Sequence, residues 1–308
     1  MASQVMTRPL CAGDLEAVVA LDASLSGHPR RGFHARRLAQ LGGPPARAVG
    51  VGAERDGRLV GFASAGVLDG EFGGSDPVGV IDAIGVAPFA RGAGVATALL
   101  GSLEKVLLEL GATHLRTQVD WSASGMGGFF QSAGFPLAPR MALERVVETP
   151  FEDEFQWEEL PVRSMEERDL PAIVRIDRHM TGRDRTPFYR RRIGETLRES
   201  GIRLSLVAET DGQATGFLMA RIDYGEFGQT EEAAVLDAIG VDPAFAGRRL
   251  GRALLEQFLL NLRSLRVEKV ITEVAWGQHD LAAFLGKAGF TPCQRLCLEK
   301  AIGAGSGR

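Results

Sequence analysis

One stretch of the sequence decides how the chain is interpreted: Val86-Ala-Pro-Phe-Ala-Arg-Gly-Ala-Gly-Val-Ala-Thr-Ala-Leu-Leu100. The apolar run before it indicates a strand, and the leucines that follow it recur at helical spacing. The stretch is therefore a glycine-rich turn from a strand into a helix. Free N–H groups at a helix N-terminus bind anions, and Gly92 and Gly94 allow the backbone to approach a phosphate closely. Taken alone, the turn also fits a tight connection before a buried helix.

The strand before this turn occurs twice in the chain. Val80-Ile-Asp-Ala-Ile-Gly-Val86 recurs 155 positions later as Val235-Leu-Asp-Ala-Ile-Gly-Val241. At that offset, without a gap, roughly a third of the residues from Arg8 to Glu144 are identical, which indicates one whole domain copied once, since solenoid repeats have periods of about 20–50 residues. We predict a first domain over 1–147, an acidic linker over 148–160, a second domain over 161–302 and a flexible tail over 303–308.

The composition fits two ordinary globular domains. The chain has 308 residues, 45% of them hydrophobic and 24% charged, and a formal net charge of −4, which argues against a dedicated nucleic-acid-binding protein. Cys11, Cys293 and Cys297 are too few for a disulfide framework, and we interpret them as structural residues rather than metal ligands. We see no signal peptide and no stretch that could span a membrane, and we expect a soluble, cytoplasmic protein.

Both copies predict the same order of elements. In the first copy these are a strand at Arg8, helices over 14–22 and 33–41, and strands over 48–54 and 59–67 joined by an Asp56-Gly57 hairpin. A strand over 80–86, a helix of about 15 residues, a strand over 115–119, a short helix and a last strand over 140–146 follow. This order predicts an α/β (α+β) fold with a mixed, mostly antiparallel sheet and helices on both faces in each copy.

A dinucleotide-binding turn is an alternative interpretation of the glycine-rich stretch. That turn needs a third glycine where Thr97 stands, and it lies early in a βαβ unit, whereas here three antiparallel-looking strands come first. Asp120 could act as the acidic residue at the end of the next strand. The topology disfavours this interpretation.

The run Val-x-Pro-x-x-Arg-x-x-Gly-x-Ala, followed by Ala-Leu-Leu, resembles the acetyl-CoA signature of the GNAT acyltransferase superfamily. The resemblance covers nearly all of both copies, including their Ala-Gly-Phe endings. It implies a central splay in each sheet, acetyl-CoA as co-substrate and no metal. It also implies that the splayed strand, Ile84, Gly85 and Val86, pairs with the pantetheine arm. The pyrophosphate would be held by backbone N–H groups of Arg91, Gly92, Ala93, Gly94, Val95 and Ala96.

The second copy departs from this signature. Ala246 stands opposite Arg91 and Arg249 opposite Gly94, where a side chain could crowd the pyrophosphate. Its arginines could instead hold phosphates, and a register shifted by two would also satisfy the motif. The counterparts in this copy are Val241, Gly247, Arg248, Arg249 and Gly251. Both interpretations, a second coenzyme A site and a purely structural partner, stay open.

Acyl transfer to an amine needs a general base. By the resemblance, this base lies on the strand before the phosphate loop, and Asp82 and its counterpart Asp237 are the candidates. Strict alternation would place Asp82 on the same face as Ile84 and Val86. The alternative is that this carboxylate holds a neighbouring loop.

The tyrosine that the resemblance implies as general acid is absent. Phe130 and Leu285 stand at its positions, so another acid is needed, such as Ser132, Gln131, water or a residue from the second copy. We interpret Trp121 and Trp276 as core residues rather than walls of an acceptor pocket. We interpret Glu71 and Glu226 as solvated turn residues rather than contacts for a cationic substrate.

These observations favour an acyl-CoA-dependent N-acyltransferase, which transfers acetyl from acetyl-CoA to a primary amine by direct attack. We expect a small-molecule or peptide amine acceptor, no nucleic-acid or membrane partner, and an internal pseudo-dimer that is a monomer or homodimer. A non-catalytic acyl-CoA-binding or regulatory protein is the alternative. Nicotinamide-cofactor chemistry is a third, weaker one.

Overall fold

The computed structural model describes residues 5–43, 47–68, 76–147, 162–199, 204–223, 225–229 and 231–303. The predicted linker over 148–160, Glu71 and nearly all of the predicted tail therefore lie outside the described residues. No helix in the described part of the chain is long and apolar enough to cross a membrane.

The first copy, here called the first repeat, forms the predicted elements in the predicted order. They are β1 (Met6–Pro9), α1 (Leu15–Ser26), α2 (Arg31–Ala39), β2 (Ala48–Arg55), β3 (Arg58–Leu68), β4 (Val78–Val86), α3 (Val95–Glu109), β5 (His114–Asp120), α4 (Ser124–Ser132) and β6 (Arg140–Val146). At the β2–β3 turn, Asp56 and Gly57 both have positive φ, the conformation that a two-residue hairpin turn needs.

The second repeat follows the same plan. Its elements are β7 (Val162–Ser164), α5 (Leu170–Thr181), α6 (Thr186–Glu199), β8 (Leu206–Thr210), β9 (Gln213–Asp223), β10 (Ala233–Val241), α7 (Leu250–Ser264), β11 (Lys269–Ala275), α8 (His279–Lys287), a short β12 (Thr291–Pro292) and β13 (Arg295–Ala301). Short 3-10 turns precede α1, α3, α5 and α7, and a further one, η5 (Glu226–Gly228), connects β9 to β10.

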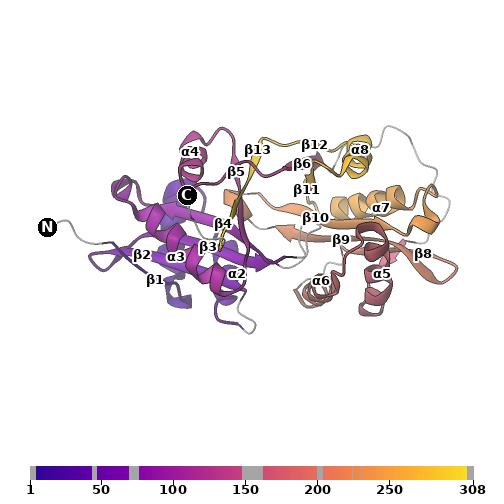
Figure 1. The fold of residues 1–308 in the computed structure, drawn as a ribbon, viewed down its shortest axis with the longest axis horizontal. Helices are drawn as coiled ribbons and strands as arrows, with labels where there is room; N and C mark the ends of the chain where they lie inside the picture. The colour runs from indigo at the N-terminus through magenta and orange to yellow at the C-terminus, as the bar shows by residue number, and fades with distance from the viewer. Residues whose placement is uncertain are drawn as a thin grey trace.

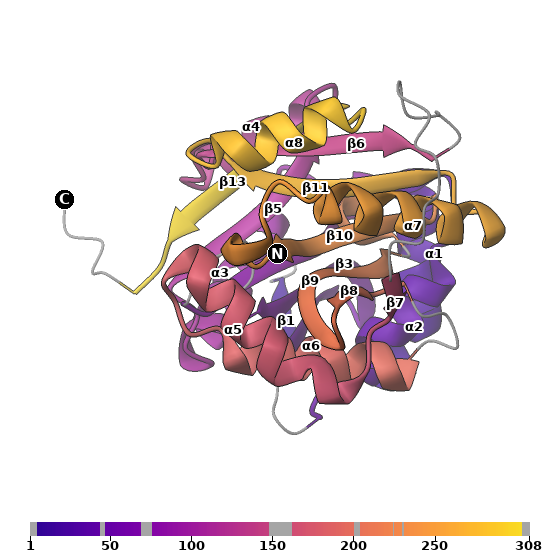
Figure 2. The ribbon, with the colours of Figure 1, turned by 90° about the vertical axis from the view of Figure 1, so that its right-hand side faces the viewer.

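The two repeats exchange their last strands, which the sequence does not predict. The strand orders are β1-β2-β3-β4-β5-β13 and β12-β6-β11-β10-β9-β8-β7. Thus β13 pairs antiparallel with β5 of the first repeat, and β6 pairs antiparallel with β11 of the second (Figures 1 and 2). The registers are equivalent, with Arg295 opposite Asp120 and Arg140 opposite Ala275, so the exchange follows a pseudo-twofold axis.

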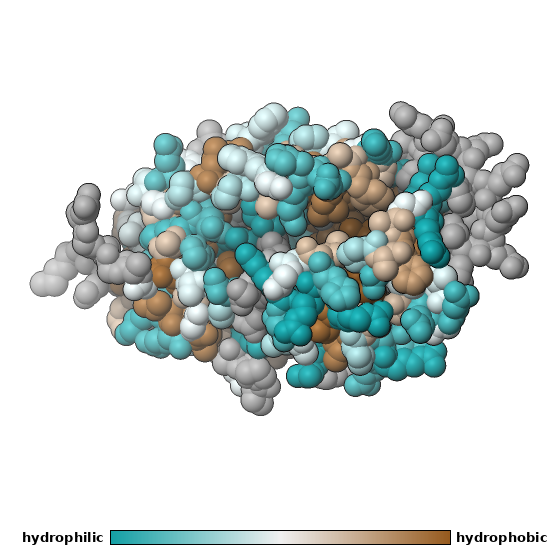
Figure 3. Space-filling view, turned by 45° about the vertical axis from the view of Figure 1, so that its right-hand side comes forward, coloured by the Kyte–Doolittle hydropathy of each residue, from teal (hydrophilic) through white to brown (hydrophobic). Residues whose placement is uncertain are grey.

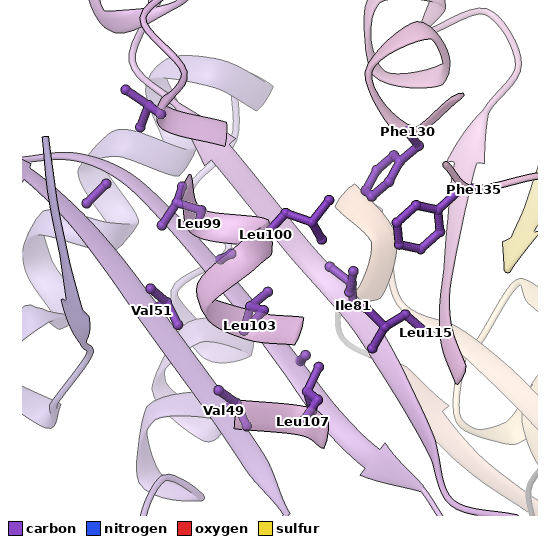
Figure 4. Packing of buried hydrophobic residues seen from close by; sticks show 14 of the residues in the cluster. Val49, Val51, Ile81, Leu99, Leu100, Leu103, Leu107, Leu115, Phe130 and Phe135 are labelled. Carbon is purple, nitrogen blue, oxygen red and sulfur yellow. The ribbon is translucent and has the colours of Figure 1, made fainter. Parts of the chain in front are cut away.

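Each sheet separates two layers of apolar side chains. In the first repeat, α1 and α2 cover one face through a cluster that includes Val18, Phe33 and Phe62. The leucines of α3 cover the other face together with Phe130 and Phe135 (Figure 4). Leu298, on the exchanged β13, belongs to this α3 cluster, and Leu143 on β6 belongs to the equivalent cluster under α7. Each repeat therefore contributes a strand to the core of the other.

Candidate active site

The central strands of each sheet pair only at their beginnings. In the first repeat β4 and β5 pair in parallel over Val78–Val80 and His114–Arg116 and then diverge. The Thr117 hydroxyl donates to the Ile81 carbonyl at 2.9 Å where the strands part. The central strands of the second repeat, β10 and β11, diverge in the same way. Where they part, the Thr272 hydroxyl donates to the Leu236 carbonyl at 2.8 Å. A splay of this kind leaves backbone groups of Ile84, Gly85 and Val86 without a strand on the β5 side.

The predicted phosphate loop lies between β4 and α3. Gly92 and Gly94 have φ values of +75° and +74°, and no atom lies within 4 Å of the position that a Cβ would take at either residue. No side chain caps α3, whose first turn begins at Val95. The loop is exposed from Arg91 to Gly94. An uncapped helix N-terminus with a bare glycine approach is suited to an anion such as a pyrophosphate.

The loop of the second repeat keeps this backbone conformation. Gly247 has φ +78° and Arg249, at the position of Gly94, has φ +59° in the same left-handed region. Again no side chain caps the helix α7. The arginine has therefore not rearranged the loop, although a non-glycine residue with this φ is strained by about 1–2 kcal/mol. Arg248 stacks on Phe245, with its guanidinium carbon 4.9 Å from the ring centroid.

Asp82 does not share a face with Ile84 and Val86, so that prediction is wrong. The register between β3 and β4 shifts at Asp82, because Ser64 pairs with Ala83 and Ala65 with Ile81. This β-bulge turns Asp82 toward α2, the side on which Ala83 packs, whereas Ile84 and Val86 pack toward α3. Asp237 lies at an equivalent bulge, between Leu236 and Ala238. The regular alternation of side chains between the two faces of a strand breaks down at both positions, because each bulge adds one residue.

The Asp82 carboxylate is almost fully buried, at 1% exposure. Ser64 Oγ donates to Asp82 Oδ1 at 2.5 Å, and Arg37 Nε on α2 lies 2.6 Å from Asp82 Oδ2. Burial raises the pKa of Asp82, and Arg37 and Ser64 oppose that rise. Asp237 has looser contacts, with Arg192 Nη2 at 3.5 Å and Arg221 Nε at 3.4 Å from its Oδ1.

The loop, the splay and the duplication together agree with the comparison with protein families. The model described as the acetyltransferase (GNAT) family matches residues 19–135 and, again, residues 156–290. The chain belongs to the GNAT family. A comparison with curated proteins found no significant match.

Solved structures show the same tandem GNAT fold. A tandem GNAT protein from the clavulanic acid biosynthesis pathway aligns with a TM-score of 0.69 and 16% identity, over 98% of this chain and 100% of that one. A GCN5-related N-acetyltransferase from Sphaerobacter thermophilus gives 0.66 and 18%, over 98% and 96% of the two chains. The glucosamine N-acetyltransferase region of a fungal multi-domain β-N-acetylglucosaminidase gives 0.72 and 15%, and this chain, 97% of it aligned, spans only 38% of that one.

In this tandem GNAT protein the two positions expected for a tyrosine acid are core positions. Phe130 and Leu285 are each 1% exposed, and Phe130 packs edge-on against Phe135. The Ser132 hydroxyl donates to the Phe129 carbonyl within its own helix. Tyr189 is fully buried, and its hydroxyl donates to Asp177 at 2.8 Å, so it does not reach across to the first repeat. Tyr224 lies outside the described residues.

The interpretation of the tryptophans as core residues is wrong. Trp121 and Trp276 are 60% and 53% exposed, directly after the strands β5 and β11 that border the splays. On the second repeat, apolar residues gather around a hollow on the surface shown in Figure 3.

In the described residues, no group of three or more His, Cys, Asp or Glu side chains could hold a metal.

Arg249 provides a test of the strain in the second loop. We expect the free energy of unfolding of Arg249→Gly to exceed that of Arg248→Gly by about 1 kcal/mol, because glycine relieves the left-handed strain at 249 only. Thermal unfolding of both variants measures this. Equal destabilisation by the two substitutions would show that Arg249 is not strained.

Proposed function

We propose that this protein is an acetyl-CoA-dependent N-acetyltransferase that acts on a primary amine. The observation that carries the proposal is the open, uncapped loop Arg91–Ala96 at the end of a splayed strand pair. The splay exposes strand backbone to which an amide-containing arm can bond, and the loop supplies N–H groups for phosphates. Membership of the GNAT family supports the same chemistry.

The reaction proposed is direct attack of the amine nitrogen on the thioester carbonyl. A C–N bond forms, the C–S bond breaks, the nitrogen loses a proton to a general base, and the leaving thiolate takes a proton from water. We propose Asp82 as the group that accepts the amine proton, because it lies on the α1–α2 face beside the splay and burial raises its pKa. Backbone N–H groups at the splay would stabilise the oxyanion.

We also propose that the second repeat binds coenzyme A, because its loop has the backbone conformation of the first. Its arginines Arg248 and Arg249 add positive charge beside the loop. Isothermal titration of the wild-type protein with acetyl-CoA should then give two sites per chain. One site per chain would make the second repeat a structural partner.

The role of the loop in the first repeat can be tested with valine substitutions at two glycines that both have a positive φ. Gly94 and Gly111 lie at opposite ends of α3 with φ +74° and +87°, and neither has an atom within 4 Å of its Cβ position. Both Gly94→Val and Gly111→Val should cost about 1–2 kcal/mol of stability. We expect only Gly94→Val to lose one acetyl-CoA site in the titration. Unchanged binding by Gly94→Val, with no acetyl-CoA site lost, would overturn the assignment.

A non-catalytic acyl-CoA-binding protein is the second candidate, favoured by the buried phenylalanine and leucine at the tyrosine positions. Release of free thiol from acetyl-CoA across a panel of amines separates the two functions. Acetyl-CoA binding without amine-dependent thiol release would favour the second candidate.

A further inference from the structure

A chain of ion pairs joins the two candidate bases through the contact between the repeats. Starting at Asp82, Arg37 Nη2 lies 2.9 Å from Glu226 Oε1 of the second repeat. Arg221 Nη2 lies 3.0 Å from Glu226 Oε2, and Arg221 Nε lies 3.4 Å from Asp237. Glu226 is thus the link between the arginine that holds Asp82 and the arginine that holds Asp237. The interpretation of Glu226 as a solvated turn residue is wrong.

The backbone around Glu226 is fixed from several sides. Asp223 Oδ1 accepts hydrogen bonds from the N–H groups of Gly225 and Glu226, at 3.0 and 2.9 Å. Arg30 of the first repeat donates to the Gly225 carbonyl at 2.5 Å. The adjacent Phe227 has φ +55°, a conformation that persists in a non-glycine residue only where its surroundings impose it.

The fixed segment packs against the first repeat's own site. The turn η5 lies against β4 and β5, the two strands that splay. Arg295, on the exchanged β13, donates to the Phe227 carbonyl at 2.8 Å and supports the turn from the other side. The first repeat is thus covered, on the face that holds Asp82, by residues of the second.

We propose that Glu226 is a positioning residue for the first repeat, which shares Arg37 with Asp82 and sets the protonation of that carboxylate from across the repeat contact. The kinetic consequence rests on the proposed function, but the electrostatic one does not. The site of the first repeat is, on this account, built by both repeats.

The charges around Asp82 give the direction of the effect. The groups that face it are Arg37 and His34 on α2, Ser64 on β3 and Glu226 on η5. Burial would raise the pKa of Glu226, but Arg221 and Arg37 outweigh it and lower that pKa to about 2, so Glu226 is an anion at neutral pH. Its charge raises the pKa of Asp82. Removing it should lower the pKa of Asp82, since Arg37 would then pair with Asp82 alone.

The experiment is a pH titration of aspartate side-chain carboxyl groups by carbon-13 NMR in the full chain. The signal that Asp82→Asn lacks belongs to Asp82. We expect its midpoint to fall by about one pH unit or more in Glu226→Gln and to stay near the wild-type value in Glu226→Asp. Glu209→Gln is the matched control, because Glu209 also pairs with an arginine, Arg163, at 2.7 Å, in another part of the fold. In Glu209→Gln the titration midpoint of Asp82 should not move.

A second variant shifts the titration in the opposite direction. In Arg221→Gln, Glu226 keeps Arg37 and the weaker influence of Arg192. Glu226 then draws Arg37 more strongly, so the pull of Arg37 on Asp82 weakens and the midpoint of Asp82 should rise. An unchanged midpoint in both Glu226→Gln and Arg221→Gln would overturn the inference. The acid limb of kcat/KM against pH should move with the carboxyl midpoint. Wild-type protein without acetyl transfer would refute the proposed function and leave the NMR result to decide the role of Glu226.

Discussion

Asp82→Asn is expected to lower kcat for acetyl transfer by about 10²- to 10⁴-fold, the usual contribution of a positioned general base. Asparagine has the size of aspartate but cannot accept the amine proton. Steady-state kinetics with acetyl-CoA and a reactive amine measure the loss, while acetyl-CoA affinity should stay within a few-fold of wild type. The pH dependence should change too, because the acid limb that reports this carboxyl disappears.

Loss of stability must be separated from loss of chemistry in this variant. Asp14→Asn is a suitable control, because Asp14 is also a buried aspartate in a close arginine pair, with Arg8 Nη2 at 2.7 Å from its Oδ1, and lies outside the proposed site. Both variants should lose stability, since each takes a carboxylate partner away from an arginine that is partly exposed, Arg8 at 36% and Arg37 at 23%. If kcat falls equally in the two, or in neither, Asp82 is a structural residue and the base lies elsewhere.

Leu298→Ala and Leu143→Ala should each destabilise the repeat to which the residue does not belong in sequence. The two leucines occupy equivalent positions on β13 and β6, and each is nearly buried in the core of the opposite repeat. Truncation of a buried leucine costs about 2–5 kcal/mol. Hydrogen exchange should show faster opening of α3 and β5 in Leu298→Ala, and of α7 and β11 in Leu143→Ala.

The opposite hydrogen-exchange pattern would contradict this prediction. Should Leu298→Ala loosen α7 and leave α3 protected, each repeat would hold its own last strand and the exchange would be wrong. Comparable loosening everywhere would mean that the exchanged strands make the two repeats one cooperative unit.

Most elements of the fold can be predicted from the sequence because the signals for each of them occur in both repeats. The Asp-Gly turns, the apolar strands and the leucine spacing of α3 are local signals, and the duplication confirms them against one another. The strand exchange cannot be predicted in this way. Strands β6 and β13 carry side-chain patterns that suit either sheet, and only the path of the chain between the repeats decides which one they join.

The candidate site is only partly readable from sequence. The conformation of Gly92 and Gly94 follows from residue type, since only glycine adopts a left-handed φ without strain. The orientation of Asp82 does not, because a bulge has no sharp sequence signal. Glu226 lies in the segment Gly225-Glu-Phe-Gly228, which repeats Gly70-Glu-Phe-Gly73, but its role depends on a long-range contact with Arg37. The same holds for Trp121 and Trp276, whose exposure is set by where the strands end.

The most direct test of the account is a crystal structure of the protein with bound acetyl-CoA. We predict the pyrophosphate at the backbone N–H groups of Gly92–Ala96, with the thioester between β4 and β5 on the side that Asp82 and Glu226 border. Acetyl-CoA bound away from this loop, or a splay that stays empty at saturating acetyl-CoA, would contradict the account.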